Sequence, residues 1–314
     1  MPPPGLHAPP SRLIFRLIPY RTFPMRSFLF VPGDSPKKMA KALDSGADAL
    51  IIDLEDSVAI GQKDEARVTT RDFVREARGA AGRPRLFVRV NALDSGLTDA
   101  DLDVVMAAAP DGVVLPKSSG GADISHLAAK IAVREAEFDL PDGATVIMPV
   151  ATETGASIFG LGSYAGASRR LIALSWGAED LSADIGAQAN RDAAGQFTGP
   201  FRLARALLLF GASAAGVAAI DTVFTGLRDL EGLDRECADA LRDGFSGKLA
   251  IHPAQIPVIH ERFTPSAAAI AEARAIVDAF AANDALGVIN IDGQMIDRPH
   301  LLRARRTLAR AGQA

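Results

Sequence analysis

Two carboxylates, Glu153 and Asp180, have the type and spacing expected of ligands for a hard metal ion. Glu153 ends an apolar run over Thr145–Glu153, and Asp180 follows shortly after the next run, Leu171–Trp176. If these runs are neighbouring strands of a parallel sheet, about 4.8 Å apart, both carboxylates can converge on one cation. Mg²⁺ typically takes one or two protein carboxylates and fills its octahedron with water and substrate oxygens. The alternative is that each carboxylate pairs with a nearby arginine or lysine.

Arg89 lies at the end of another apolar run, so its guanidinium must leave the core where that strand ends. A planar fork at this position suits a carboxylate or a developing enolate oxygen. A salt bridge to Glu55 or Asp56 is the alternative, and both interpretations hold if these acids orient the arginine. Lys117 ends a further run and could bind substrate or pair with an acid.

Acidic residues also gather after the second apolar run. Asp53 and Glu55 share one face of a strand because side chains alternate, and Asp56 follows them. Catalysis, support of a metal site and loop capping are all open to these acids. We expect Glu55 and Asp56 to orient the residues that contact the substrate or metal, without contacting the substrate or metal themselves.

Eight short apolar runs must position these residues. Most are continuous rather than alternating, which is typical of strands buried on both faces of a parallel sheet. Segments with helical spacing separate them, a pattern that predicts right-handed β–α crossovers. We therefore predict a (β/α)8 TIM barrel with a C-terminal helical extension, and in such barrels the active site lies at the carboxyl ends of the strands. The predicted strands are Ser27–Pro32, Ala49–Glu55, Arg85–Asn91, Gly112–Lys117, Thr145–Glu153, Leu171–Trp176, Ala218–Phe224 and Lys248–Pro253.

The pattern divides the chain into three parts. Residues 1–24 contain many prolines and no acid, and we expect a disordered or non-native extension. Residues 25–262 form the predicted barrel. Residues 263–314 add two predicted helices, Ser266–Ala282 and Pro299–Ala311, as a C-terminal arm or lid.

Composition narrows the class of protein further. The 314 residues are 48% hydrophobic and 23% charged, as in an ordinary globular enzyme. A net charge of −4 argues against a nucleic-acid partner. No apolar run approaches the roughly 20 residues that span a bilayer, so we expect no membrane partner. The single cysteine excludes an internal disulfide and favours a cytoplasmic location.

Several motifs together resemble one family. The chain resembles citrate lyase β-subunit-like proteins over residues 26–312, within the wider HpcH/HpaI aldolase class that includes malyl-CoA, methylmalyl-CoA and citramalyl-CoA lyases. The motifs that carry the resemblance are FVPGD at 30–34, IDLEDSV at 52–58, FVRVN at 87–91, LPK at 115–117, Glu153-Thr154, GAED at 177–180, the segment 247–253 and GQMID at 293–297.

The resemblance implies roles for individual residues. Glu153 and Asp180 would be Mg²⁺ ligands, and Arg89 would contact the substrate. Apart from the resemblance, we also expect Lys117 and Glu153 to bind substrate. Asp297 would be a catalytic acid or base that the arm brings to the site of a neighbouring subunit. The alternative is that Asp297 caps the helix beginning near Pro299. Members commonly form trimers, so the resemblance implies a homo-oligomer, a trimer or hexamer.

The implied activity is Mg²⁺-dependent cleavage or formation of a carbon–carbon bond. A 3-hydroxy-3-carboxy acyl thioester, such as a malyl, citramalyl or citryl thioester, would give an α-keto acid and a shorter acyl thioester. The thioester carrier, coenzyme A or acyl-carrier protein, stays open. The alternatives are a metal-dependent aldolase on free hydroxy-keto acids, a malyl-CoA thioesterase, and a non-catalytic subunit of a citrate lyase complex.

Overall fold

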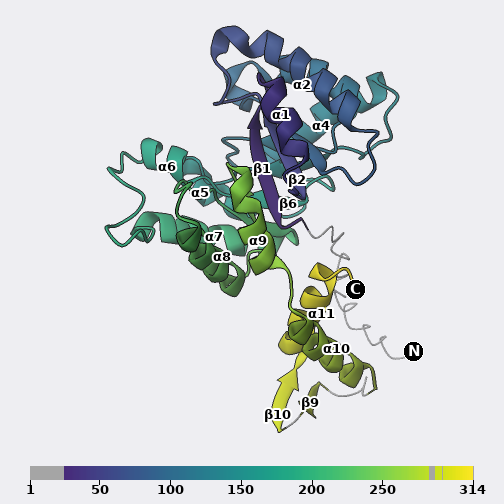
Figure 1. Ribbon diagram of the computed structural model, residues 1–314, viewed down its shortest axis with the longest axis vertical. Coiled ribbons are helices and arrows are strands. Elements are labelled where there is room, and N and C mark those ends of the chain that lie inside the picture. The colour runs from purple at the N-terminus through teal and green to yellow at the C-terminus, as the bar shows by residue number, and fades with distance from the viewer. Residues whose placement is uncertain (1–24, 283–286, 292, 314) are drawn as a thin grey trace, which may run out of the picture.

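The chain folds around a barrel of eight parallel strands, which confirms the predicted (β/α)8 TIM barrel (Figure 1). The computed structural model describes residues 25–282, 287–291 and 293–313, so the predicted extension over residues 1–24 lies outside the described residues. The strand order is β5-β4-β3-β2-β1-β8-β7-β6. Parallel bridges from Ile147 to Leu171 and from Val150 to Ser175 connect β5 to β6 and close the barrel. The strands are β1 Ser27–Pro32, β2 Ala49–Asp53, β3 Arg85–Arg89, β4 Gly112–Leu115, β5 Val146–Pro149, β6 Ala173–Ser175, β7 Ala218–Asp221 and β8 Gly247–Ala250.

Every predicted strand is present, but several end earlier than predicted. The polar residues that we placed at the ends of strands, such as Glu55, Lys117 and Glu153, lie instead in the loops that follow β2, β4 and β5. These loops surround the mouth of the barrel at its carboxyl end. The difference matters because loop residues can turn their side chains toward a common centre, whereas ladder residues alternate between faces.

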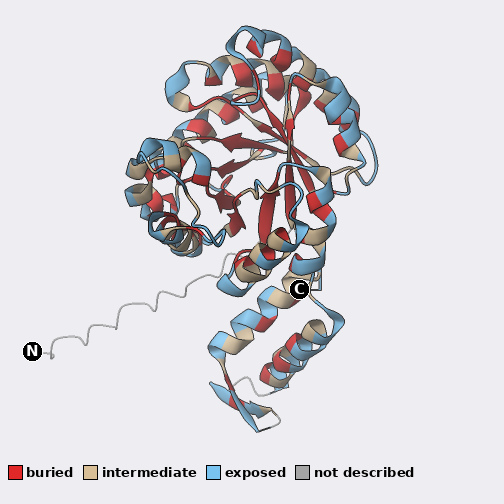
Figure 2. Cartoon of the chain, turned by 60° about the vertical axis from the view of Figure 1, so that its left-hand side comes forward, coloured by how far each residue is buried: buried red, intermediate tan, exposed pale blue. Residues whose placement is uncertain are grey.

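The barrel has two packed layers. Its interior holds one buried cluster that includes the edge-to-face pair of Phe28 and Phe87, with ring centroids 5.9 Å apart. A larger cluster fills the space between the strands and the surrounding helices. Buried residues lie on the strands and on the inner faces of the helices (Figure 2). Strands buried on both sides explain why the sequence reads as continuous apolar runs.

Helices surround the strands. Two of them, α6 and α9, were not predicted from the sequence. The helices of the barrel are α1 Pro36–Leu43, α2 Lys63–Ala77, α3 Thr98–Val105, α4 Gly121–Glu137, α5 Gly155–Gly160, α6 Ala178–Asp184, α7 Gly199–Ala215, α8 Leu230–Asp243 and α9 Ile256–Phe263, with short 3-10 turns η1 Ile60–Gln62, η2 Leu93–Ser95, η3 Met106–Ala108, η4 Leu161–Tyr164 and η5 Pro253–Gln255. Among the described residues, no helix combines the length and apolar character that crossing a membrane requires.

A C-terminal arm extends away from the barrel (Figures 1 and 2). It consists of α10 Ala267–Ala282, the antiparallel pair β9 Val288–Ile291 and β10 Gln294–Asp297, and α11 Arg298–Arg310. The arm has a small hydrophobic core of its own, built around Ile276, Phe280 and Leu308. It begins at the amino end of the barrel, because Thr264 accepts a hydrogen bond of 2.8 Å from Arg26, which immediately precedes β1.

Candidate functional site

The structure brings Glu153 and Asp180 together at the carboxyl end of the barrel. Glu153 follows β5, and Asp180 lies in the first turn of α6. A Cβ atom at Gly177 would lie only 2.7 Å from Glu153 Cγ, so the chain that enters α6 passes directly against Glu153. Lys117 contacts both acids: its backbone N–H donates to Glu153 Oε2, and its Nζ lies 3.9 Å from Asp180 Oδ1. The two predicted ligands therefore share one neighbourhood.

Glu153 is a buried carboxylate with little compensation for a negative charge. Only 3% of the residue is exposed. Burial raises the pKa of Glu153 to about 8; the Lys117 N–H opposes the rise, and the charges of Asp180 and Glu55 add to it. Within the described residues, Glu153 accepts its hydrogen bond from a backbone N–H rather than from a cationic side chain. A cation at this position would remove the penalty of burying the ionised form.

Arg89 is held in place mainly by Asp53. Its Nε and Nη2 atoms donate to the two Asp53 carboxylate oxygens, each at 2.7 Å. The two residues are direct partners in the register of β2 and β3. Glu55 Oε2 lies 2.8 Å from Arg89 Nη1, and an Asp56 oxygen lies 3.9 Å away. The salt bridge to Glu55 that we considered as the alternative therefore forms, but the bidentate partner is Asp53, which was not predicted from the sequence.

Glu55 joins Arg89 to Lys117. Its Oε1 pairs with Lys117 Nζ. Its Oε2 is buried and has no hydrogen-bond partner among the described residues, although Arg89 Nη1 is close. Burial raises the pKa of Glu55 despite the charges of Arg89 and Lys117. The ion pair between Arg89 and Glu55 thus lacks good hydrogen-bond alignment, and the N–H donors of Arg89 Nη1 can serve another anion while Nε and Nη2 stay on Asp53.

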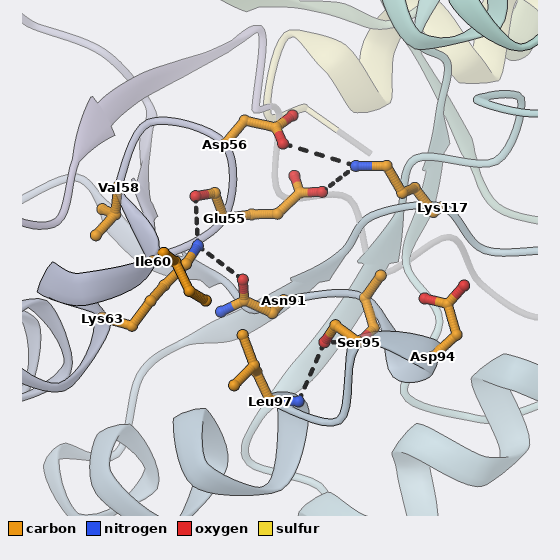
Figure 3. A pocket seen from close by; sticks show the side chains of 11 residues that line it. Glu55, Asp56, Val58, Ile60, Lys63, Asn91, Asp94, Ser95, Leu97 and Lys117 are labelled. Atoms are coloured by element: carbon orange, nitrogen blue, oxygen red, sulfur yellow. Dashed lines mark hydrogen bonds and ion pairs between the residues drawn. The ribbon is translucent and has the colours of Figure 1, made fainter.

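A cavity of about 420 Å³ lies beside this cluster, and Glu55, Asp56 and Lys117 form part of its wall (Figure 3). Lys63 and Asn91 form another part of the wall. The buried Lys63 Nζ donates to the Leu54 and Glu55 carbonyl oxygens at 2.7 and 2.6 Å and to Asn91 Oδ1 at 2.8 Å. Lys63 thereby fixes the turn that carries Glu55 and Asp56. Its role was not predicted, because a lysine at the start of a charged helix is ordinarily solvated.

The chemistry available to a metal here is limited to a pair of carboxylates. The described residues contain no group of three or more histidine, cysteine, aspartate or glutamate side chains arranged to hold a metal ion. A closed zinc-type site of four protein ligands is therefore not what these residues form. A pair of carboxylates, the buried Glu153 and the partly exposed Asp180, matches the way in which Mg²⁺ is usually held, with the remaining positions left to water and substrate.

Asp297 lies apart from this cluster. It is the N-cap of α11, with its side chain accepting from the His300 N–H, so the capping role that we considered is present. The arm that carries Asp297 leaves the barrel at the amino end, opposite the mouth where Glu153 and Asp180 lie. The structure therefore does not bring Asp297 to the site of its own chain.

Comparison with known proteins decides the family. The family model for HpcH/HpaI aldolase/citrate lyase matches residues 26–253. The chain belongs to the HpcH/HpaI aldolase/citrate lyase family. This family assignment agrees with the resemblance seen in the sequence and with the barrel fold.

Relatives in this family carry two kinds of name. The citrate lyase subunit beta of Leuconostoc mesenteroides subsp. cremoris is 36% identical over 285 residues, 90% of this chain and 92% of the relative. A (3S)-malyl-CoA thioesterase of Cereibacter sphaeroides is 34% identical over 294 residues, 93% of this chain and 96% of the relative. Among solved structures, protein CitE from Mycobacterium tuberculosis in complex with magnesium, acetoacetate and coenzyme A has a TM-score of 0.72 and 34% identity, covering 91% of this chain and 98% of CitE.

Proposed function

We propose that the protein is a Mg²⁺-dependent carbon–carbon lyase acting on a 3-hydroxy-3-carboxy acyl thioester. The products are an α-keto acid and a shorter acyl thioester, and the reverse reaction is the corresponding condensation. The observation that carries this proposal is the convergence of Glu153 and Asp180, two carboxylates that share Lys117 as a neighbour at the barrel mouth. The chain's membership of a lyase family and the names of its relatives support it.

The proposed Mg²⁺ ligands are Glu153 and Asp180. The buried Glu153 carboxylate fits this role because its surroundings otherwise penalise its charge. When bound, Mg²⁺ supplies a Lewis acid for the hydroxyl and carboxylate oxygens at C3 of the substrate. The magnesium complex of the Mycobacterium tuberculosis protein supports this choice of ion.

Arg89 and Lys117 are the proposed cationic contacts for the substrate. Arg89 is 12% exposed and carries a full charge, because the salt bridges to Asp53 and Glu55 raise its pKa despite the opposing effect of burial. Its Nη1, which makes no aligned hydrogen bond to Glu55, is the atom that we expect to contact the substrate while Nε and Nη2 stay on Asp53. Lys117 Nζ lies between Glu55 and Asp180 and is positioned to bind a substrate carboxylate. Glu55 and Asp56 keep these two cations at the mouth.

The bond change needs two proton movements. The C3 hydroxyl would give its proton to a general base, for which the Asp297 carboxylate is the proposed group; the C2–C3 bond breaks, and the electron pair passes to the thioester, where Arg89 would stabilise the enolate oxygen. C2 then takes up a proton to give the shorter acyl thioester. Asp297 is the proposed donor, and it would come from the arm of another copy, since its own arm leaves from the far end of the barrel. A homo-oligomer, trimer or hexamer, is part of the proposal.

The first experiment asks which bond breaks. Malyl-CoA, citramalyl-CoA and citryl thioesters are incubated with the purified chain and Mg²⁺, and the α-keto acid and acyl thioester are measured. We expect a keto acid to form with at least one thioester and to stop forming with a chelator. A chain that forms a keto acid equally well after chelation contradicts the proposal.

A matched pair of variants tests the ligands. Asp180→Asn removes a proposed ligand, whereas Glu179→Gln changes its neighbour, which contacts the side chain of Asn190 at 2.9 Å. We expect loss of keto-acid formation in Asp180→Asn and retention in Glu179→Gln. Full activity in Asp180→Asn rules out the proposed ligand pair.

A mixture of two inactive variants tests the shared site. Glu153→Gln lacks the ligand and Asp297→Asn lacks the proton donor, so each homo-oligomer should be inactive. Mixing and reassembling them should restore activity, because some sites then combine an intact Glu153 with an intact Asp297 from another copy. No recovery on mixing, with both variants folded, contradicts the assignment of Asp297 to a neighbour's site.

A thioesterase is the second candidate, favoured by the relatives that carry that name. It would release free coenzyme A and malate from malyl-CoA rather than a keto acid. The same assay separates the two by product. An aldolase on free hydroxy-keto acids would act without the thioester and tolerate removal of residues 285–314. A non-catalytic subunit would be inactive alone with every thioester.

A further inference from the structure

Lys117 lies in a segment with an uncommon backbone. Its φ angle is 53°, in the left-handed region that residues other than glycine rarely occupy. Gly120, three residues after Lys117, has a φ angle of 156°. Residues in such conformations persist only where the surrounding structure holds them. The backbone N–H of Lys117 is also the group that donates to Glu153 Oε2, so whatever holds this segment also orients that N–H.

Tyr164 forms a hydrogen bond that fixes this segment. It lies in η4, from the following β–α unit, and its side chain is fully buried. Its hydroxyl donates to Ser118 Oγ at 2.9 Å and approaches the Ser118 carbonyl oxygen at 3.3 Å. Burial raises the pKa of Tyr164, so the phenol remains protonated and acts as a donor. Ser118 is itself buried, with 1% of the residue exposed, so its hydroxyl needs an internal hydrogen-bond partner.

The same segment packs against η4 with almost no space. A Cβ atom at Gly160 would lie 1.9 Å from the Ser119 carbonyl oxygen, and one at Gly121 would lie 2.1 Å from the Ser163 carbonyl oxygen. The Gly121 N–H donates to Ser163 Oγ at 2.8 Å. The loop after β4 thus contacts the segment 160–164 at Ser119 and Gly121, directly after the Tyr164 hydrogen bond to Ser118, and Ser118 is the residue next to Lys117.

We propose that Tyr164 is a positioning residue for the metal site: through Ser118 it holds the Lys117 N–H against Glu153 and so fixes the orientation of that carboxylate. This inference rests on the proposed function, because it gives the orientation of Glu153 a purpose. Tyr164 contacts neither the ion nor the substrate. Its effect passes through one hydrogen bond and one strained residue.

The test is calorimetric titration of Mg²⁺ into the metal-free full-length protein. Tyr164→Phe keeps the ring and removes the donor. We expect its Mg²⁺ affinity to fall by about tenfold, the lower end of what loss of a supporting contact behind a metal ligand typically costs. Ser118→Ala should cost less, because the Tyr164 hydroxyl can still donate to the carbonyl oxygen of residue 118.

The matched control is Thr145→Val, which removes another buried hydroxyl, one that donates to Pro110 at 3.3 Å at the amino end of the barrel. We expect Thr145→Val to lower the thermal midpoint without changing the Mg²⁺ affinity. A Tyr164→Phe protein that melts earlier but binds Mg²⁺ as tightly as the wild type overturns the inference and leaves the proposed function intact. A wild-type protein that binds no Mg²⁺ overturns both.

Discussion

A buried glutamate lies near each end of strand β5, and the two differ in whether a cationic side chain compensates the charge. Glu135, on α4, is 1% exposed and receives the backbone N–H of Thr145 just before β5 begins. It also accepts two hydrogen bonds from Arg170, at 2.7 and 2.6 Å. Glu153, which follows β5, is 3% exposed and lies against the like charge of Asp180.

The pKa values record this difference. Burial alone would raise the pKa of Glu135, but Arg170 and the N–H groups of Thr145 and Gly143 outweigh it, and the pKa is lowered. At Glu153 burial dominates, and the pKa rises to about 8. One end of the strand therefore has a completed ion pair that supports the fold. At the other end, Glu153 lies near a second carboxylate, and a bound cation would compensate its charge.

The largest expected effect is on turnover. Glu153→Gln should lower keto-acid formation by on the order of 1,000-fold, because a metal ligand contributes several kcal/mol of transition-state stabilisation and each 1.36 kcal/mol is tenfold. Steady-state assays at saturating Mg²⁺ measure it. The same variant should not destabilise the metal-free protein, since the Glu153 side chain forms no salt bridge within the described part of the chain and accepts its hydrogen bond from a backbone N–H. A large loss of metal-free stability in Glu153→Gln would mean that the two ends of β5 do not differ as described.

The matching change at the other end should affect stability instead. Glu135→Gln leaves the buried Arg170 with only the exposed Asp142 carboxylate, 3.0 Å from its Nη2, as a charged partner, and the loss of the buried partner typically costs about 3 kcal/mol. Denaturant unfolding of the metal-free proteins measures the loss. Turnover per folded molecule should stay near that of the wild type. A Glu135→Gln protein as stable as the wild type contradicts the comparison.

The stability that Glu135 contributes should depend on pH in a definite direction. Its folded-state pKa lies below the ordinary value of 4.5, so its contribution is fully present above pH 4.5. It is lost as the pH falls through the folded-state pKa. The gap in unfolding free energy between wild type and Glu135→Gln should therefore narrow on acidification below pH 4.5. A gap that widens on acidification contradicts the sign of the shift.

A smaller effect comes from Gly177. Gly177→Ala places a Cβ 2.7 Å from Glu153 Cγ, so Glu153 or the start of α6 must move. We expect Mg²⁺ affinity to fall by about tenfold, as for other changes that displace a ligand indirectly. Gly162→Ala is the control, because a Cβ there meets nothing within 4 Å. Equal Mg²⁺ affinity in both alanine variants contradicts the close approach of α6 to Glu153.

The sequence predicts the barrel well and places the candidate residues at one end of it, for physical reasons. Strands buried on both faces leave continuous apolar runs, and Glu153, Asp180 and Lys117 interrupt or follow those runs at the same end. The pairing of Asp53 with Arg89 was not predicted, because the predicted strands continue to Glu55 and Asn91, whereas β2 and β3 end at Asp53 and Arg89.

Other features depend on tertiary packing and leave no local trace. The contact of Tyr164 with Ser118 joins residues 46 positions apart, and nothing near either residue indicates it. Helix α6 has only 7 residues, too few for a helical period to stand out. The buried position of Lys63 depends on three acceptors supplied by the loops after β2 and β3.

The central claim is that Glu153 and Asp180 hold one divalent cation between them. Titration of the metal-free protein with Mn²⁺, followed by electron paramagnetic resonance, tests it directly because bound and free Mn²⁺ differ in signal. The account predicts one bound ion per chain, displaced by Mg²⁺, and no such binding in Glu153→Gln or Asp180→Asn. Binding of the same stoichiometry and affinity in both variants, or none in the wild type, would contradict it.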